Sequence, residues 1–199
     1  MIGHPAIRPG LQCLGGRGSS LDHTQALEQF LAGIERRAFR IAEIATGDVD
    51  EAMDLVQDAM FKLVQRYRRR DASEWGPLFH RILQSRIRDW YRRTQVRKRW
   101  RRWFWPSDDD AQEDPIEAIP DGSTGPLDEQ VQQKRAYAAL ETAIRQLPLR
   151  QQQAFLLRAW EELDVKQTAA AMGCSEGSVK THYSRAVHSL RKNLGDHWP

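Results

Sequence analysis

The chain has 199 residues, and 30 Lys and Arg against 27 Asp and Glu give it a formal net charge of +3 at pH 7. No apolar run approaches the ~20 residues that a membrane-spanning helix needs, so membrane insertion is not expected. The two cysteines, Cys13 and Cys174, lie far apart and form no CxxC pair, which argues against a disulfide framework and a zinc site.

The first third of the sequence predicts an irregular start followed by two helices. Residues 1–21 are rich in Gly and Pro and lack the continuous apolar segment of a signal peptide, so we expect a disordered extension on a cytoplasmic protein. Beyond them helical periodicity dominates and no strand pattern appears, which predicts an all-α fold. Helices are expected over about 22–45 and 48–67, the second with Asp48 as N-cap and Glu51 three residues later.

The second predicted helix has two different sides. One carries apolar residues at steps of three and four, which is typical of a core-facing stripe: Val49, Ala52, Met53, Val56, Met60, Leu63, Val64 and Tyr67. The other holds Asp54, Asp58 and Phe61, with Gln57 at its edge. An exposed aromatic ring beside carboxylates predicts a protein-binding patch. The alternative is that Phe61 packs under the N-terminal segment.

A third helix is expected to start near Trp75 or Pro77 and to run into a basic block. Nine of the residues from 86 to 102 are Lys or Arg, and one is Asp. Aromatic residues interleave with these cations: Trp90, Tyr91, Trp100, Trp103, Phe104 and Trp105. Cations neutralise phosphates, and an exposed ring stacked on an unpaired base contributes roughly 1–3 kcal/mol. The block therefore favours opened, single-stranded nucleic acid. The alternative is a solvated arginine face over core aromatics, and Trp90 is predicted to be core.

An acidic segment interrupted by prolines follows the basic block. Nine of the residues from 107 to 129 are Asp or Glu and none is basic. Such a stretch is too polar to pack, so residues 106–126 are predicted to be a flexible linker. It would join two small helical domains, 22–105 and 127–196.

The C-terminal part carries the pattern of a helix-turn-helix. Ala169 is small enough for a close helix crossing, Gly173 tolerates the positive φ of a sharp turn, and Ser175 is the N-cap of the next helix. That helix has an inner stripe of Val179, Tyr183, Ala186, Leu190 and Leu194. Its opposite face bears Lys180, Thr181, Ser184, Arg185 and His188, which suits the major groove of duplex DNA. The alternative is an ordinary helical hairpin with a solvated polar face.

Three segments together resemble one family, the extracytoplasmic-function (ECF) group of bacterial RNA polymerase sigma factors. They are VDEAMDLVQDAMFKLVQRY at 49–67, LFHRILQSRIRDWYRRTQVRK at 78–98 and LPLRQQQAFLLRAWEELDVKQTAAAMGCSEGSVKTHYSRAVHSLR at 147–191. These look like the family's regions 2.1–2.2, 2.3–2.4 and 4. The resemblance implies an alternative sigma factor that binds core RNA polymerase and directs promoter recognition, DNA melting and transcription initiation.

The resemblance also assigns roles to residues. The surface that docks on the clamp helices of the polymerase β′ subunit would be Asp54, Gln57, Asp58, Phe61 and Lys62. The minus-ten element would be held by Arg69 and Arg70 in a base-capturing loop and by Ser85, Arg86, Asp89, Arg92 and Arg93. The minus-thirty-five element would be read by Ser175, Ser178, Lys180, Thr181, Ser184 and Arg185.

The family further implies a contact with the β flap, control by an anti-sigma factor, and a linker that mimics RNA in the polymerase cleft. Two positions depart from its pattern. Ser85 stands where the family often has a base-contacting Asn, and Gln167 with Thr168 stands where Glu and Ile are frequent.

Other classes of protein fit less of the chain. Asp108, Asp109 and Asp110 could be imagined as magnesium ligands of a nuclease, but a polar linker offers no fixed geometry for a hard cation. No Ser-His-Asp arrangement, P-loop or HExxH motif is present, so no enzyme, cofactor or metal is expected. A stand-alone helix-turn-helix regulator would explain only residues 127–196. A regulatory protein that mimics a sigma factor and binds a partner instead of DNA is the third alternative.

Overall fold

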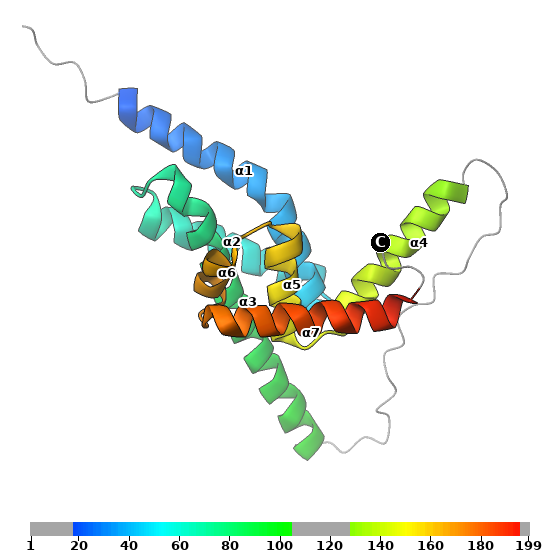
Figure 1. Ribbon diagram of the computed structural model, residues 1–199. Helices are drawn as coiled ribbons and strands as arrows, with labels where there is room; N and C mark the ends of the chain where they lie inside the picture. The colour runs from blue at the N-terminus through cyan, green and yellow to red at the C-terminus, as the bar shows by residue number, and fades with distance from the viewer. Residues whose placement is uncertain (1–17, 105–127, 196–199) are drawn as a thin grey trace, which may run out of the picture.

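The computed structural model describes residues 18–104 and 128–195, and these form helices joined by short turns (Figure 1). The N-terminal half consists of α1 (Gly18–Thr46), α2 (Val49–Tyr67) and α3 (Ala72–Phe104). The C-terminal half consists of α4 (Asp128–Arg145), α5 (Leu149–Phe155), a π-helix η1 (Leu156–Trp160), α6 (Val165–Met172) and α7 (Glu176–Leu194). No strand occurs in these two stretches, which confirms the predicted all-α fold class.

The predicted start of the second helix is confirmed, because local capping chemistry fixes it, whereas α1 begins at Gly18 and not near residue 22. The side chain of Asp48 accepts a hydrogen bond from the backbone N–H of Glu51 at 3.0 Å, as the N-cap pattern predicts. The third helix was expected to begin near Trp75 or Pro77, but it begins at Ala72, so Pro77 lies inside it. Pro77 is the sixth residue of the helix and lacks the N–H that would bond to the carbonyl four residues back, so α3 forgoes one backbone hydrogen bond there.

The turn between α6 and α7 has the predicted geometry. Gly173 ends α6 in the left-handed region at φ 64°, and its N–H bonds to the carbonyl of Ala169. The Ser175 side chain then accepts a bond from the N–H of Ser178 at 3.2 Å and caps α7. At the other end of α6, Asp164 and Gln167 form a reciprocal capping box, at 2.7 and 2.9 Å. Gln167, a departure from the family pattern, therefore supports the fold here.

Replacing Gly173 by alanine should lower the free energy of unfolding by roughly 1–2 kcal/mol, because an L-residue is strained in the left-handed region. A Cβ atom there would meet only Arg88 Nη2, at 4.0 Å, so the effect is conformational and not a clash. Gly177→Ala is the matched control, since Gly177 is helical and alanine is favoured over glycine in a helix. Denaturant unfolding distinguishes the two variants, and equal stability of both would contradict the turn geometry.

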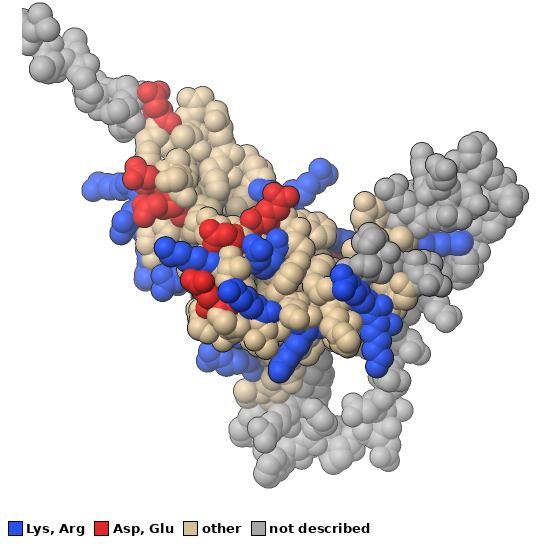
Figure 2. Space-filling view, viewed as in Figure 1, with Lys and Arg blue, Asp and Glu red and all other residues tan. Residues whose placement is uncertain are grey.

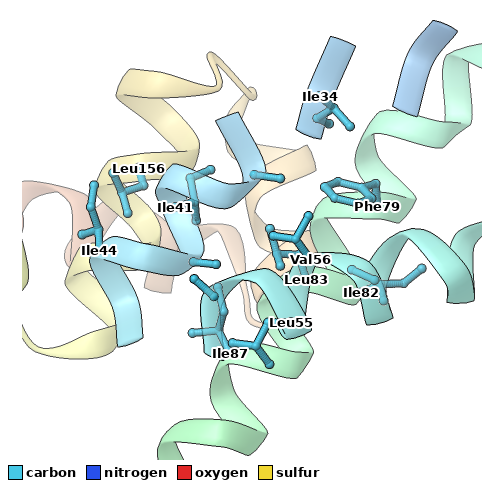
Figure 3. Packing of buried hydrophobic residues seen from close by; sticks show 14 of the residues in the cluster. Ile34, Ile41, Ile44, Leu55, Val56, Phe79, Ile82, Leu83, Ile87 and Leu156 are labelled. Carbon is cyan, nitrogen blue, oxygen red and sulfur yellow. The ribbon is translucent and has the colours of Figure 1, made fainter. Parts of the chain in front are cut away.

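The buried side chains form one main core that joins the two halves. Ile34, Ile41 and Ile44 of α1 pack against residues of α2 and α3, as Figure 3 shows. Leu156, from the C-terminal half, lies beside Ile41 and Ile44 in the same cluster. α3 also packs on α6, and α1 on α4. The division into domains at 22–105 and 127–196 stays a prediction, but no sequence pattern indicated this packing between them.

A second, smaller cluster holds the helix-turn-helix together. It contains Ala169, Met172 and Val179, with Tyr183 packed at its edge. The predicted inner stripe of α7 is confirmed, because Val179 is buried in this cluster and Ala186, Leu190 and Leu194 are buried in the main core. In the described stretches, no helix is long and apolar enough to cross a membrane.

Candidate nucleic-acid and protein-binding surfaces

The outer face of α7 is exposed and carries most of the predicted minus-thirty-five residues. Lys180, Thr181 and Arg185 lie on this face, while Val179 on the opposite side is buried. Lys and Arg side chains are spread over the side of the molecule on which α7 lies (Figures 1 and 2). Cations held on a rigid helix can reach phosphates and base edges of a duplex. This face therefore has the chemistry of a duplex-reading surface.

The small polar residues at the start of α7 are engaged within the helix. Ser175 Oγ lies 2.9 Å from Ser178 Oγ, and the Thr181 hydroxyl donates to the carbonyl of Gly177 at 3.0 Å. Ser178 is half-buried. These three side chains are thus pre-oriented by the helix, and the long cationic side chains that project from this face are Lys180 and Arg185.

His182 adjoins this face and is held toward its neutral form. Burial, followed by the positive charges of Arg150 and Arg185, lowers the pKa of His182 below its ordinary value. His182 therefore adds little to the positive charge of this face near neutral pH.

The predicted minus-ten residues of α3 form a partly exposed cationic strip. Arg92 and Arg93 are the exposed cations of this strip, whereas Arg86 and Ser85 are half-buried. Further along, Arg92, Arg93 and Arg97 border a shallow groove with the exposed Val96. Exposed cations beside an apolar side chain suit a nucleic-acid strand whose bases are unpaired.

Asp89 is the single acidic member of the predicted minus-ten set. It is exposed on the same helix as Arg86 and Arg92, one turn from each. A carboxylate among arginines is repelled by phosphates but can accept a hydrogen bond from a base amino group. Asp89 is therefore better suited to a base edge than to the nucleic-acid backbone.

The aromatic residues of the basic block divide into two groups. Trp90 is half-buried and packs against the main core, as predicted, while Tyr91 beside it is 38% exposed. Only Tyr91 is therefore placed to stack on a base in this part of α3. The side chains of Trp100, Trp103, Phe104 and Trp105 lie outside the described residues, as does the linker at 106–126.

The turn between α2 and α3 presents Arg69 and Arg70, and both are exposed. The turn is fixed by a bond from the N–H of Arg70 to the carbonyl of Tyr67 at 2.9 Å, and by a 3.7 Å ion pair between Arg70 and Glu74. His23 of α1 contacts the carbonyl of Arg68, with 2.6 Å between Nε2 and the oxygen. The expected base-capturing loop is thus anchored to the helices around it.

The predicted protein-binding patch lies on the outer side of α2. Asp54, Gln57, Asp58 and Phe61 are exposed, and Lys62 is half-buried. Phe61 is 68% exposed, the largest value among the exposed large apolar side chains of the described residues, so it does not pack under α1. Asp58 also forms a 3.8 Å ion pair with Arg86, which connects this patch to the cationic strip of α3.

Part of the predicted apolar stripe on α2 was assigned wrongly. Val49 and Met53 are 52% and 47% exposed, while Leu55, which was not in the predicted stripe, is buried. Periodicity places side chains around a helix but does not show how far the neighbouring helices cover it. Met53 instead lines a groove between α1 and α2, together with Phe39. Exposed apolar residues on the same helix as Phe61 extend the candidate protein-binding surface.

Comparison with known proteins finds relatives that span both halves of the chain. Residues 137–190 match the family described as "Sigma-70, region 4". RNA polymerase sigma-E factor of Streptomyces avermitilis is 31% identical over 168 residues, 84% of this chain and 84% of the relative. RNA polymerase sigma-E factor of Streptomyces antibioticus is 30% identical over 148 residues, 74% of this chain and 72% of the relative.

A solved structure shares the arrangement of helices. It is the sigma factor RpoE from Bartonella quintana, in a co-crystal with the anti-sigma factor NepR. The match has a TM-score of 0.54 and 28% identity, and it covers 87% of this chain and 96% of the other. The similarity therefore extends over the helices of both halves.

Proposed function

This chain belongs to the extracytoplasmic-function group of RNA polymerase sigma factors, and we propose from that membership that it directs core RNA polymerase to promoters. The chain binds core polymerase, recognises promoter DNA and assists its melting at the start of transcription. Its part in initiation is binding, while the polymerase carries out the chemistry. A transcription assay with purified core polymerase tests this function directly.

The observation that supports this proposal is that one chain carries two different exposed surfaces. These are an exposed cationic helix after a left-handed turn, α7, and an exposed aromatic–acidic patch on α2. A stand-alone helix-turn-helix regulator would need the first surface and would have no use for the second. A protein that only captured a partner protein would not need the exposed Lys180 and Arg185.

Each surface has a proposed role. The outer face of α7 reads the duplex at the minus-thirty-five element through Lys180 and Arg185. The cationic strip of α3 and the arginines of the α2–α3 turn hold the opened minus-ten element. The α2 patch around Phe61 docks on the β′ clamp helices, and the C-terminal half contacts the β flap.

Control by an anti-sigma factor fits the exposed patch. The structural relative from Bartonella quintana was crystallised with the anti-sigma factor NepR. A large aromatic ring left 68% exposed in the free chain suits a surface that is covered in each of its working complexes. We infer that polymerase and an anti-sigma factor compete for this chain.

Replacing Lys180 or Arg185 by alanine should weaken binding of the polymerase complex to the upstream element by roughly 1–3 kcal/mol, about 5- to 150-fold. Titration of labelled promoter DNA at fixed salt measures the change. Lys192→Ala is the matched control, because Lys192 is also exposed on α7 but near its far end, and it should change affinity little. Equal effects of all three substitutions would indicate non-specific attraction and contradict the assigned reading face.

A further inference from the structure

A carboxylate is buried between the two halves of the chain. The side chain of Glu161 is only 3% exposed, and Oε2 lies 3.2 Å from Nε2 of His80, whose side chain is also 3% exposed. Oε1 lies 3.9 Å from Nε of Arg37. Both partners belong to the N-terminal half, on α3 and α1. Because a buried carboxylate is unfavourable unless it is paired, Glu161 would be expected to face water if it had no role there.

The backbone makes a special turn to place this side chain. η1 is a π-helix, and the N–H of Glu161 bonds to the carbonyl of Leu156, five residues back, at 3.0 Å. Glu162, which follows, has a positive φ of 54°. π-turns are rare, and a glutamate in the left-handed region is unfavourable. Two energetically unfavourable backbone conformations therefore occur side by side at this point. Together they direct Glu161 inward and leave Glu162 exposed.

Other polar contacts cross the same boundary. Arg40 of α1 pairs with Glu141 of α4. Arg88 of α3 donates from Nη1 to the carbonyl of Met172 at 2.6 Å, and Arg150 donates to the same oxygen at 2.8 Å. Met172 ends α6, directly before the turn that leads to α7. The helix that is proposed to hold the minus-ten element is therefore bonded to the turn that positions the minus-thirty-five reader.

This packing cannot be the arrangement that binds a promoter. The two elements are centred about 25 base pairs apart, which is roughly 85 Å along B-DNA at about 3.4 Å per base pair. In the closed chain, α3 and α6 pack side by side and are joined by the hydrogen bond from Arg88 to the carbonyl of Met172. For both surfaces to reach their elements at once, the two halves must separate, and the pairs made by Glu161 must break.

We propose that Glu161, held by Arg37 and His80, is the clasp that keeps the two halves of the free protein in this closed arrangement. The need to open on a promoter rests on the proposed function, whereas the clasp itself rests on the contacts above. When most molecules are closed, the apparent affinity for polymerase and promoter is the affinity of the open form multiplied by the fraction of molecules that are open. Opening returns the paired side chains of the clasp to water, which offsets part of the lost attraction between them.

A charge-swap cycle read by energy transfer tests the clasp in the full-length free protein. Cys13 and Cys174 are replaced by serine, and dyes are attached to cysteines at two exposed positions on neighbouring helices, Arg81 of α3 and Lys166 of α6. The parent protein should show high transfer. Arg37→Glu and Glu161→Arg should each lower the ratio of closed to open molecules by at least about tenfold, or 1.4 kcal/mol. The double variant should recover most of the transfer.

Glu162→Arg is the matched control, because it places the same charge one residue away on an exposed side chain, and it should behave like the parent. Arg37 is itself 55% exposed, so Arg37→Glu is expected to fold and carries the test if Glu161→Arg loses helicity by circular dichroism. Low transfer in the parent, or equal transfer in Arg37→Glu and the parent, would overturn the clasp.

Addition of core polymerase separates the clasp from the proposed function. Polymerase should lower the transfer of the parent protein as the halves part. If the charge swap behaves as expected but polymerase does not bind, the sigma-factor function fails and the clasp stands. If polymerase binds and transfer stays high, the closed state is not inhibitory.

Discussion

Phe61→Ala should weaken assembly with core RNA polymerase by about 30-fold or more, which corresponds to at least ~2 kcal/mol. The ring is 68% exposed on α2 and has acidic neighbours, so a partner can bury nearly all of it. Buried aromatic anchors with a polar surround dominate the energy of most protein interfaces. Binding to core polymerase, and separately to a fragment that contains the β′ clamp helices, measures the loss.

Tyr137→Ala is the matched control for the clamp-helix fragment. Tyr137 is 64% exposed but lies on α4, in the other half of the chain, so its removal should leave binding to that fragment unchanged. Asp58→Ala should weaken binding to the fragment less than Phe61→Ala does. The carboxylate of Asp58 already pairs with Arg86 at 3.8 Å, so only part of its charge is available to a binding partner. Normal affinity of the Phe61 variant for the fragment would refute the docking patch.

Phe79→Ala should lower the free energy of unfolding by about 3–5 kcal/mol, the usual effect of removing a buried phenylalanine ring. Phe79 is fully buried in the main core, and its ring centroid lies 6.5 Å from that of Phe30 and 5.7 Å from that of His80. Since His80 pairs with Glu161, the cavity should also loosen the contact between the halves. Denaturant titration followed by circular dichroism measures the change.

The same titration on Phe61→Ala gives the complementary result. A surface truncation away from special contacts usually changes stability by less than ~0.5 kcal/mol. The two phenylalanine variants should thus separate cleanly, with Phe79 supporting the fold and Phe61 supporting recognition. Similar destabilisation by both would contradict the exposed position of Phe61.

Local features of this fold could be predicted from sequence because their causes are local. Asp48 and Ser175 each cap a helix through a side chain that reaches three residues ahead, and Gly173 supplies a left-handed turn that few other residues accept. The exposed face of α7 follows from the same logic, since its inner stripe repeats every three or four residues. Such patterns involve neighbours in sequence and need no knowledge of the remaining chain.

The packing between the halves could not be predicted, because it depends on neighbours that are far apart in sequence. Glu161 looks like any other surface glutamate in a polar stretch, and only the π-turn and the distant Arg37 and His80 make it a buried partner. The error at Val49 and Met53 has the same origin. Their periodicity is that of a helix face, but no local pattern shows where the neighbouring helix ends.

The assigned roles of individual residues rest on the family and on their placement in this structure. Lys180 and Arg185 project from an exposed helix, whereas Ser178 and Thr181 are partly engaged within it. Ser85, which replaces a common Asn, is half-buried beside Arg86. Its short side chain reaches less far than an amide would, so a minus-ten preference different from that of relatives is expected.

Run-off transcription tests the central claim most directly. Purified chain is added to core RNA polymerase with a template that carries the gene's own upstream region, and the length of the transcript reports the start site. A single defined transcript that depends on the added chain, and that weakens with Lys180→Ala or Phe61→Ala, is the expected result. If the chain neither associates with core polymerase nor changes where transcription starts on any such template, its proposed role in promoter recognition is wrong.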